Sequence, residues 1–233
     1  MWRLGAASVV VVSCVLGACS GEPTAQPEPV VRGAHQSRLG ALRATTPAYP
    51  LDAVPRALSD RELACPRVDA RAFAGEALRF TPAANVIEPF RQRLLEFESI
   101  TREVALRVYA RVPSKILVAA SYGCRSVNGK NRRLSEHALG NAIDVRGFAF
   151  PPAALPFKDA ALPVALQGAF EVHVGEHWKA RGDPATRRHA RFLRELTDQL
   201  VSRHTFRTLL GPAHPDHADH FHFDMARDDY VDL

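Results

Sequence analysis

The stretch HFHFDMA, residues 220–226, alternates aromatic or apolar side chains with histidine and aspartate. In a β-strand, successive side chains point to opposite faces of the sheet. The pattern therefore predicts a strand with its phenylalanines in the core and with His220, His222 and Asp224 together on the other face. A merely solvated face gives the same pattern, so a functional interpretation requires a second element that meets these histidines.

That second element is RLSEHALGNAIDVRGF, residues 133–148, which places His137 before a turn at Gly140 and Asp144 on the outer face of the following strand. If this strand pairs with the C-terminal one, Asp144 and His222 converge, and the turn brings His137 over them. Two imidazoles, one carboxylate and a water make a four-coordinate site with an open position, which is typical of hydrolytic zinc. Other divalent first-row metals also fit such a ligand set.

The rest of the chain predicts helices and strands around these two motifs. Apolar residues at helical spacing predict a helix within 88–113 and a second within 185–204, the latter beginning near Asp183. Runs rich in β-branched residues predict strands over 115–122 and 141–150. The strands are too few and too unevenly spaced for a doubly wound fold. We therefore expect an α+β domain with a small, mostly antiparallel sheet flanked by helices.

The N-terminus has the features of an export signal. Residues 1–18 contain one early cation and about a dozen apolar or small residues, which is typical of a secretory segment. The letters LGAC, ending at Cys19, resemble a bacterial lipobox, so we expect lipidation at Cys19, with a plain signal peptide as the alternative. Residues 19–50 are rich in Pro, Ala, Glu, Gln and Thr and predict a flexible tether. The folded domain is expected over 51–233.

Export also bears on the cysteines and on the partner. Cys65 and Cys124 are the only cysteines after Cys19, and in an oxidising compartment we expect them to form a disulfide. The formal net charge is +5 and the pI is about 9.3, yet the basic residues are dispersed and form no stripe with interleaved aromatic residues. We therefore expect a monomer whose partner is an anionic cell-wall polymer, peptidoglycan, rather than nucleic acid.

Two sets of motifs resemble known families. The pattern SxHxxGxAxD at 135–144, followed far downstream by HxH at 220–222, resembles the signature of D-Ala-D-Ala metallopeptidases, lysostaphin-type enzymes and the Hedgehog signalling domain. The blocks SYGCR, LSEHALGNAIDVRGF, LLGP and DHFHFD resemble the bacterial extensin-like C-terminal domain, over roughly residues 60–228. The resemblance implies a Hedgehog-like or D-Ala-D-Ala-peptidase-like zinc fold.

The resemblance also implies a role for each matching residue. His137, Asp144 and His222 match the three metal ligands of these enzymes, which implies Zn²⁺ as the cofactor. His220 matches the histidine that stands beside the metal-bound water. Arg125 lies where related peptidases hold the substrate carbonyl or its developing oxyanion. A general base and a guanidinium beside zinc make a coherent hydrolytic site.

A second residue competes for the role of general base. Asp219 lies three residues before His222, which echoes the Glu-x-x-His arrangement of other members of the wider group. Strict strand alternation turns Asp219 away from the metal, so His220 is favoured. His214 and His217 are expected at the rim of the site, on the preceding loop.

These expectations combine into one hypothesis. The chain is predicted to be a zinc metallopeptidase of the periplasm, held by a lipid at the outer membrane, that cleaves peptidoglycan cross-links as a D,D-endopeptidase. A D,D-carboxypeptidase is the alternative within the same chemistry. A non-catalytic, zinc-stabilised peptidoglycan-binding lipoprotein is the alternative of a different class, because Hedgehog-like relatives keep the metal while serving as a binding surface. A histidine-rich metal scavenger would not need Gly140, Ala142 and Asp144 at their spacing.

Overall fold

A computed structural model of the chain describes residues 49–57, 63–127, 133–153 and 162–233. The predicted signal segment, the lipidation site at Cys19 and the tether up to residue 48 lie outside the described residues. Within the described ranges, the helices are too short or too polar to cross a lipid bilayer.

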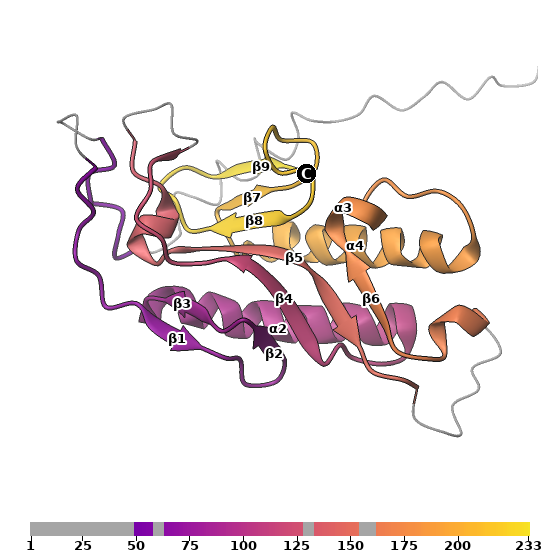
Figure 1. The fold of residues 1–233 in the computed structure, drawn as a ribbon. Helices are drawn as coiled ribbons and strands as arrows, with labels where there is room; N and C mark the ends of the chain where they lie inside the picture. The colour runs from indigo at the N-terminus through magenta and orange to yellow at the C-terminus, as the bar shows by residue number, and fades with distance from the viewer. Residues whose placement is uncertain (1–48, 58–62, 128–132, 154–161) are drawn as a thin grey trace, which may run out of the picture.

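The described residues form an α+β structure, as the sequence predicts (Figure 1). The strands are β1 (Arg71–Phe73), β2 (Arg79–Thr81), β3 (Ala84–Val86), β4 (Lys115–Ala120), β5 (Ala142–Phe150), β6 (Phe170–His173), β7 (Thr208–Leu210), β8 (Phe221–Asp224) and β9 (Tyr230–Asp232). The helical segments are α2 (Glu88–Tyr109), η2 (Glu136–Leu139), η3 (Val164–Leu166), α3 (Val174–His177) and α4 (Pro184–Ser202).

The main sheet has seven strands in the order β2-β4-β5-β8-β7-β9, with β6 paired to β5. The pairs β2–β4 and β7–β9 are parallel, and β1 and β3 form a separate two-stranded sheet. The expectation of a small, mostly antiparallel sheet is therefore wrong: the sheet is larger and mixed. Strands β2, β7 and β9 have only three residues each, too few to give a periodic pattern in the sequence.

Strand β5 is the centre of the sheet and the element that builds the site. It pairs antiparallel with β8 in a register that sets Asp144 directly opposite His222. Side chains alternate along both strands, so Ile143 of β5 and Phe223 of β8 are fully buried in the core on the other face. The strand pairing that was predicted to bring Asp144 and His222 together is thus present.

Helices α2 and α4 cover the core face of the sheet (Figure 1). Phe97 of α2 and Phe192 of α4 both contact Phe148 of β5, with ring centroids 6.4 and 5.2 Å apart. The helix starts follow the sequence signals: Asp183 caps α4 by accepting hydrogen bonds from backbone N–H groups of its first turn. The helices thus bury one side of β5 and leave the other side to the polar groups.

Candidate metal centre

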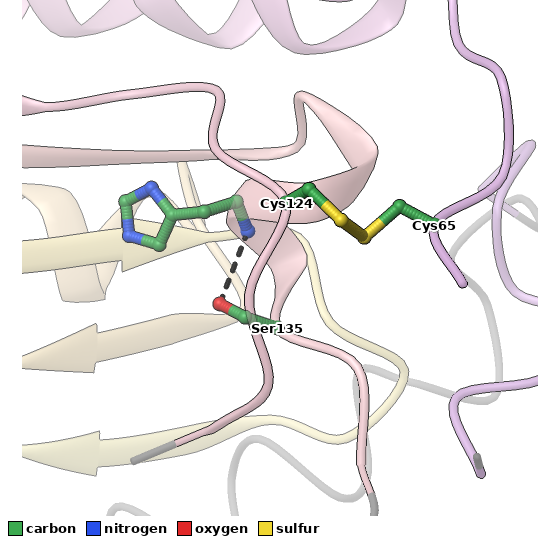
Figure 2. The surroundings of a disulfide bond; sticks show 4 residues. Cys65, Cys124 and Ser135 are labelled. Carbon is green, nitrogen blue, oxygen red and sulfur yellow. Dashed lines mark hydrogen bonds between the residues drawn. A yellow bond between two sulfur atoms is a disulfide. The ribbon is translucent and has the colours of Figure 1, made fainter. Parts of the chain in front are cut away.

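His137 lies on the short 3₁₀ turn η2, whose two ends are fixed by Ser135 and Gly140. The Ser135 hydroxyl accepts a hydrogen bond of 3.3 Å from the backbone N–H of His137 (Figure 2). Gly140 has a φ of 62°, and a Cβ atom there would lie 3.2 Å from the backbone nitrogen of Ile87. A left-handed backbone and a close neighbour both favour glycine. The predicted turn at Gly140 is therefore present, and it directs His137 toward β5.

A buried ion pair holds the same turn from behind. Glu136 is buried and accepts a hydrogen bond of 2.8 Å from Nε of Arg56. The Asn141 side-chain amide donates to the Glu136 carboxylate at 2.6 Å and to the carbonyl oxygen of Met225 at 3.1 Å. These contacts tie the turn that carries His137 to segment 49–57 and to the residue after β8.

His137, Asp144 and His222 converge into one buried triad. The Nε2 atom of His137 lies 3.1 Å from both Oδ1 of Asp144 and Nδ1 of His222. The latter two atoms are 2.8 Å apart. Each residue offers one ligand atom, and all three ligand atoms lie within 4.8 Å of one another. The three residues predicted as metal ligands therefore form a group that can hold a metal ion.

The second nitrogen of each imidazole is occupied by a partner outside the triad. Nδ1 of His137 lies 2.5 Å from the carbonyl oxygen of Ser121, and Nε2 of His222 lies 2.7 Å from Oδ2 of Asp224. Such outer contacts fix the tautomer and the direction of a metal-binding histidine. The sequence placed Asp224 on the correct face, but we assigned it no role; its contact with His222 requires the folded structure.

The triad is strongly coupled in its protonation. Burial alone would raise the pKa of Asp144, but hydrogen bonds with His137 and His222 outweigh it and hold that pKa well below its usual value. Burial alone would lower the pKa of His222, but hydrogen bonds to Asp144 and Asp224 raise it to about 9. Without metal, His222 therefore holds a proton at neutral pH. A metal ion must displace this proton, so affinity increases as the pH rises toward about 9.

The donor set matches the chemistry of a divalent transition metal. Two neutral imidazole nitrogens and one carboxylate oxygen, each backed by an outer hydrogen bond, are typical of zinc and of its first-row neighbours. Within the described residues, no other group of three or more His, Cys, Asp or Glu gathers its ligand atoms so closely. The residues present thus fit a divalent first-row metal ion.

Arg125 lies beside the triad and contacts one of its members, Asp144. Its Nη2 atom is 3.3 Å from Oδ2 of Asp144, the carboxylate oxygen that does not face the imidazoles. The Arg125 side chain remains 54% exposed, whereas that of Asp144 is 7% exposed. The guanidinium therefore orients Asp144 from the solvent side and remains accessible from the cavity.

His220 and Asp219 form a pair beside the triad. Nε2 of His220 lies 3.9 Å from Oδ1 of Asp144, and its Nδ1 lies 2.8 Å from Oδ1 of Asp219. The Asp219 side chain is 85% exposed, whereas that of His220 is 19% exposed. His220 thus stands between the triad and Asp219, and Asp219 reaches the site only through the imidazole.

A cavity of about 760 Å³ opens over the triad. His137, His220 and His222 line it, together with the segment that carries Arg125. A second cavity of about 560 Å³ borders segment 52–57 and shares Arg133 and Asp228 with the first. The two cavities therefore lie next to each other.

The predicted disulfide between Cys65 and Cys124 is present (Figure 2). It links the segment before β1 to the loop after β4, directly ahead of Arg125. The same loop supplies the Ser121 carbonyl to His137, and its Gly123 N–H donates to the His137 carbonyl at 3.2 Å. The disulfide thus anchors a loop that contacts the triad at two points.

Removing this disulfide is expected to lower the free energy of unfolding by about 4 kcal/mol, because it closes a loop with a sequence separation of 59 in the unfolded chain. Urea denaturation of Cys65→Ala/Cys124→Ala measures the loss. Wild type under a reducing agent should fall to the stability of the variant, and the variant itself should not respond. A wild-type midpoint that is unchanged on full reduction would contradict this expectation.

Comparison with known proteins indicates a family for part of the chain. The fold and the triad define an α+β domain with a buried His-Asp-His group that can hold a metal ion. Residues 52–154 match the family model described as extensin-like protein C-terminus. This match supports the extensin-like C-terminal family that the motifs indicate, for the part of the chain with His137 and Asp144. No curated protein and no solved structure matches the chain.

Proposed function

We propose that the chain is a zinc-dependent peptidoglycan hydrolase of the bacterial envelope, a D,D-endopeptidase that cleaves peptide cross-links. The observation that carries the proposal is the His137–Asp144–His222 triad at the base of a cavity, with His220 beside it. A structural zinc site is closed by four protein ligands, whereas a triad open to a cavity leaves a position for water and substrate. The identity of the metal as zinc, the export of the chain and its lipid anchor are all parts of this proposal.

His137 and His222 would hold the ion through Nε2 and Nδ1, respectively, and Asp144 through Oδ1. A bound zinc ion supplies Lewis-acid polarisation of the scissile carbonyl and lowers the pKa of a water molecule. His220 is placed to accept a proton at Nε2 from the attacking water and to pass it to the leaving amine. No covalent nucleophile is required.

The contact between Asp219 and His220 supports His220 rather than Asp219 as the general base. A carboxylate that accepts from Nδ1–H fixes the imidazole with Nε2 unprotonated, which is the nitrogen nearer to Asp144. Asp219 is thereby a positioning residue, and the base is His220. Arg125 is proposed to stabilise the developing negative charge on the carbonyl oxygen, since its half-exposed guanidinium is accessible from the cavity.

The shape of the site favours an endopeptidase over a carboxypeptidase. An enzyme that cuts within a cross-link must accommodate chain on both sides of the scissile bond. The cavity over the triad and a second cavity along segment 52–57 are neighbours that share Arg133 and Asp228 in their linings. Two neighbouring cavities provide room for chain on more than one side of the triad.

Digestion of purified peptidoglycan, read by mass spectrometry, tests the proposal. Zinc-loaded protein is expected to convert cross-linked muropeptide dimers into monomers with new amine ends. A chelator should abolish the conversion, and added zinc should restore it. Loss of terminal D-alanine from monomers with the dimers intact would instead assign a carboxypeptidase. Intact muropeptides throughout, with protein bound to the wall, would leave the binding lipoprotein.

A further inference from the structure

A row of aromatic rings leads from the exposed Tyr230 to the triad. The ring centroids of Tyr230 and His214 lie 6.0 Å apart, and those of His214 and His217 lie 5.0 Å apart. His217 then lies 5.0 Å from His220 and 5.7 Å from His222, a member of the triad. All five side chains line the same cavity. We call His214, His217 and His220 the histidine row.

Each imidazole of the histidine row is held in the same way. The Nδ1 atom of His214 lies 3.0 Å from Oδ2 of Asp232, and that of His217 lies 2.9 Å from the Pro215 carbonyl oxygen. The Nδ1 atom of His220 likewise lies 2.8 Å from the Asp219 carboxylate. Because these partners only accept hydrogen bonds, each Nδ1 carries the proton. In the neutral ring, Nε2 then has a free lone pair, which is the form that binds metals.

The two ends of the histidine row are more exposed than the histidines of the triad. The side chains of His214 and His220 are 24% and 19% exposed, whereas those of His222 and His137 are 10% and 1% exposed. An ion from solvent therefore meets the outer imidazoles before it can reach the triad. A buried triad also requires the ion to exchange its waters for protein ligands, and intermediate imidazoles allow that exchange to occur in steps.

We propose that the histidine row captures a divalent transition-metal ion at the cavity mouth and delivers it to the triad. This inference rests on the proposed use of the triad as a metal site. Among the described residues, only the triad gathers three ligand atoms within 4.8 Å, so the row is not a second permanent site. The ion passes from His214 to His217 and then to His220, with neighbouring imidazoles exchanging it.

Loading with Co²⁺, followed in a stopped-flow spectrometer by its visible absorption, tests the path. His217→Gln interrupts the row in the middle, and His214→Gln/His217→Gln removes two of its members. Both variants are expected to load about tenfold more slowly than wild type, because a captured ion can no longer pass stepwise to the triad and the gain in on-rate is lost. His204→Asn is the matched control: it removes a histidine that lines neither cavity, at a position with a φ of 53° that asparagine tolerates.

A path changes rates in both directions and leaves the equilibrium unchanged. Release of Co²⁺ to a chelator should therefore slow by the same factor as loading, with the affinity equal to that of wild type. The single and double variants should be equally slow, since one gap is enough to break a sequential path. Unchanged loading in His217→Gln, or a loss of affinity equal to the loss of rate, would overturn the path alone. Absence of any Co²⁺ spectrum in wild type would overturn the metal site as well.

Discussion

Alanine at His137, Asp144 or His222 is expected to remove most of the zinc from the purified protein, whereas wild type should retain about one ion per chain. Each substitution deletes one of only three protein ligands. For Asp144→Ala it also leaves two adjacent imidazoles without the carboxylate between them. Metal content by mass spectrometry after dialysis measures the loss. His204→Asn, remote from the triad, should keep its full zinc content.

Asp224, the hydrogen-bond partner of His222 outside the triad, provides a variant with a smaller expected loss of zinc affinity. Asp224→Ala deletes an outer contact and not a ligand, so it is expected to weaken zinc affinity by about 10- to 100-fold, less than any ligand substitution. Competition with a chromophoric chelator places the variants in order. Full zinc occupancy in two of the three ligand variants would rule out the ligand set. Asp224 would then have no role in metal binding.

The two strands that meet at the triad could be predicted because the sequence there carries two consistent patterns. Alternation in 220–226 separates the phenylalanines from the histidines, and the same alternation places Asp144 opposite the core side of β5. One face of each strand is buried, so a shift in register by one residue would bury charged groups. The pairing was therefore strongly determined by local sequence.

The size and mixed character of the sheet could not be predicted in this way. Strands β2, β7 and β9 have three residues each, and a run of three cannot be distinguished from a loop by its periodicity. Their positions follow from long-range packing: β2 joins β4 in parallel, and β9 joins β7 in parallel. The sheet expected from the sequence therefore contained only its long, patterned members.

The hydrogen-bond partners of Arg125 and Asp219 could not be predicted from the sequence either. Arg125 was expected to face the substrate, and its contact with Asp144 depends on a loop held by the disulfide. Alternation was expected to turn Asp219 away from the triad, yet His220 precedes the first residue of β8, so strict strand geometry does not apply to either residue. A contact between adjacent side chains then became possible.

Alanine at His220 is expected to lower turnover by about 10² to 10⁴-fold while the protein keeps its zinc, because a positioned base contributes that much to rate and His220 is beside the ligand set rather than in it. Cleavage of a defined cross-linked muropeptide dimer, with zinc content measured on the same preparation, gives both quantities. The effect should fall mainly on kcat, since the imidazole acts on the proton and not on binding of the peptide.

Asp219→Ala is the matched comparison, because it removes the carboxylate behind His220 and leaves the imidazole in place. Its loss of turnover should be smaller than that of His220→Ala, since a positioning residue acts only through the group it orients. A larger loss in Asp219→Ala would make the aspartate the base. A binding lipoprotein would behave differently from either enzyme: wild type would release no new amine ends, and wall retention would be the same in His220→Ala. That pair of results would exclude the peptidase, because a surface that only binds the wall has no need of a base beside its metal.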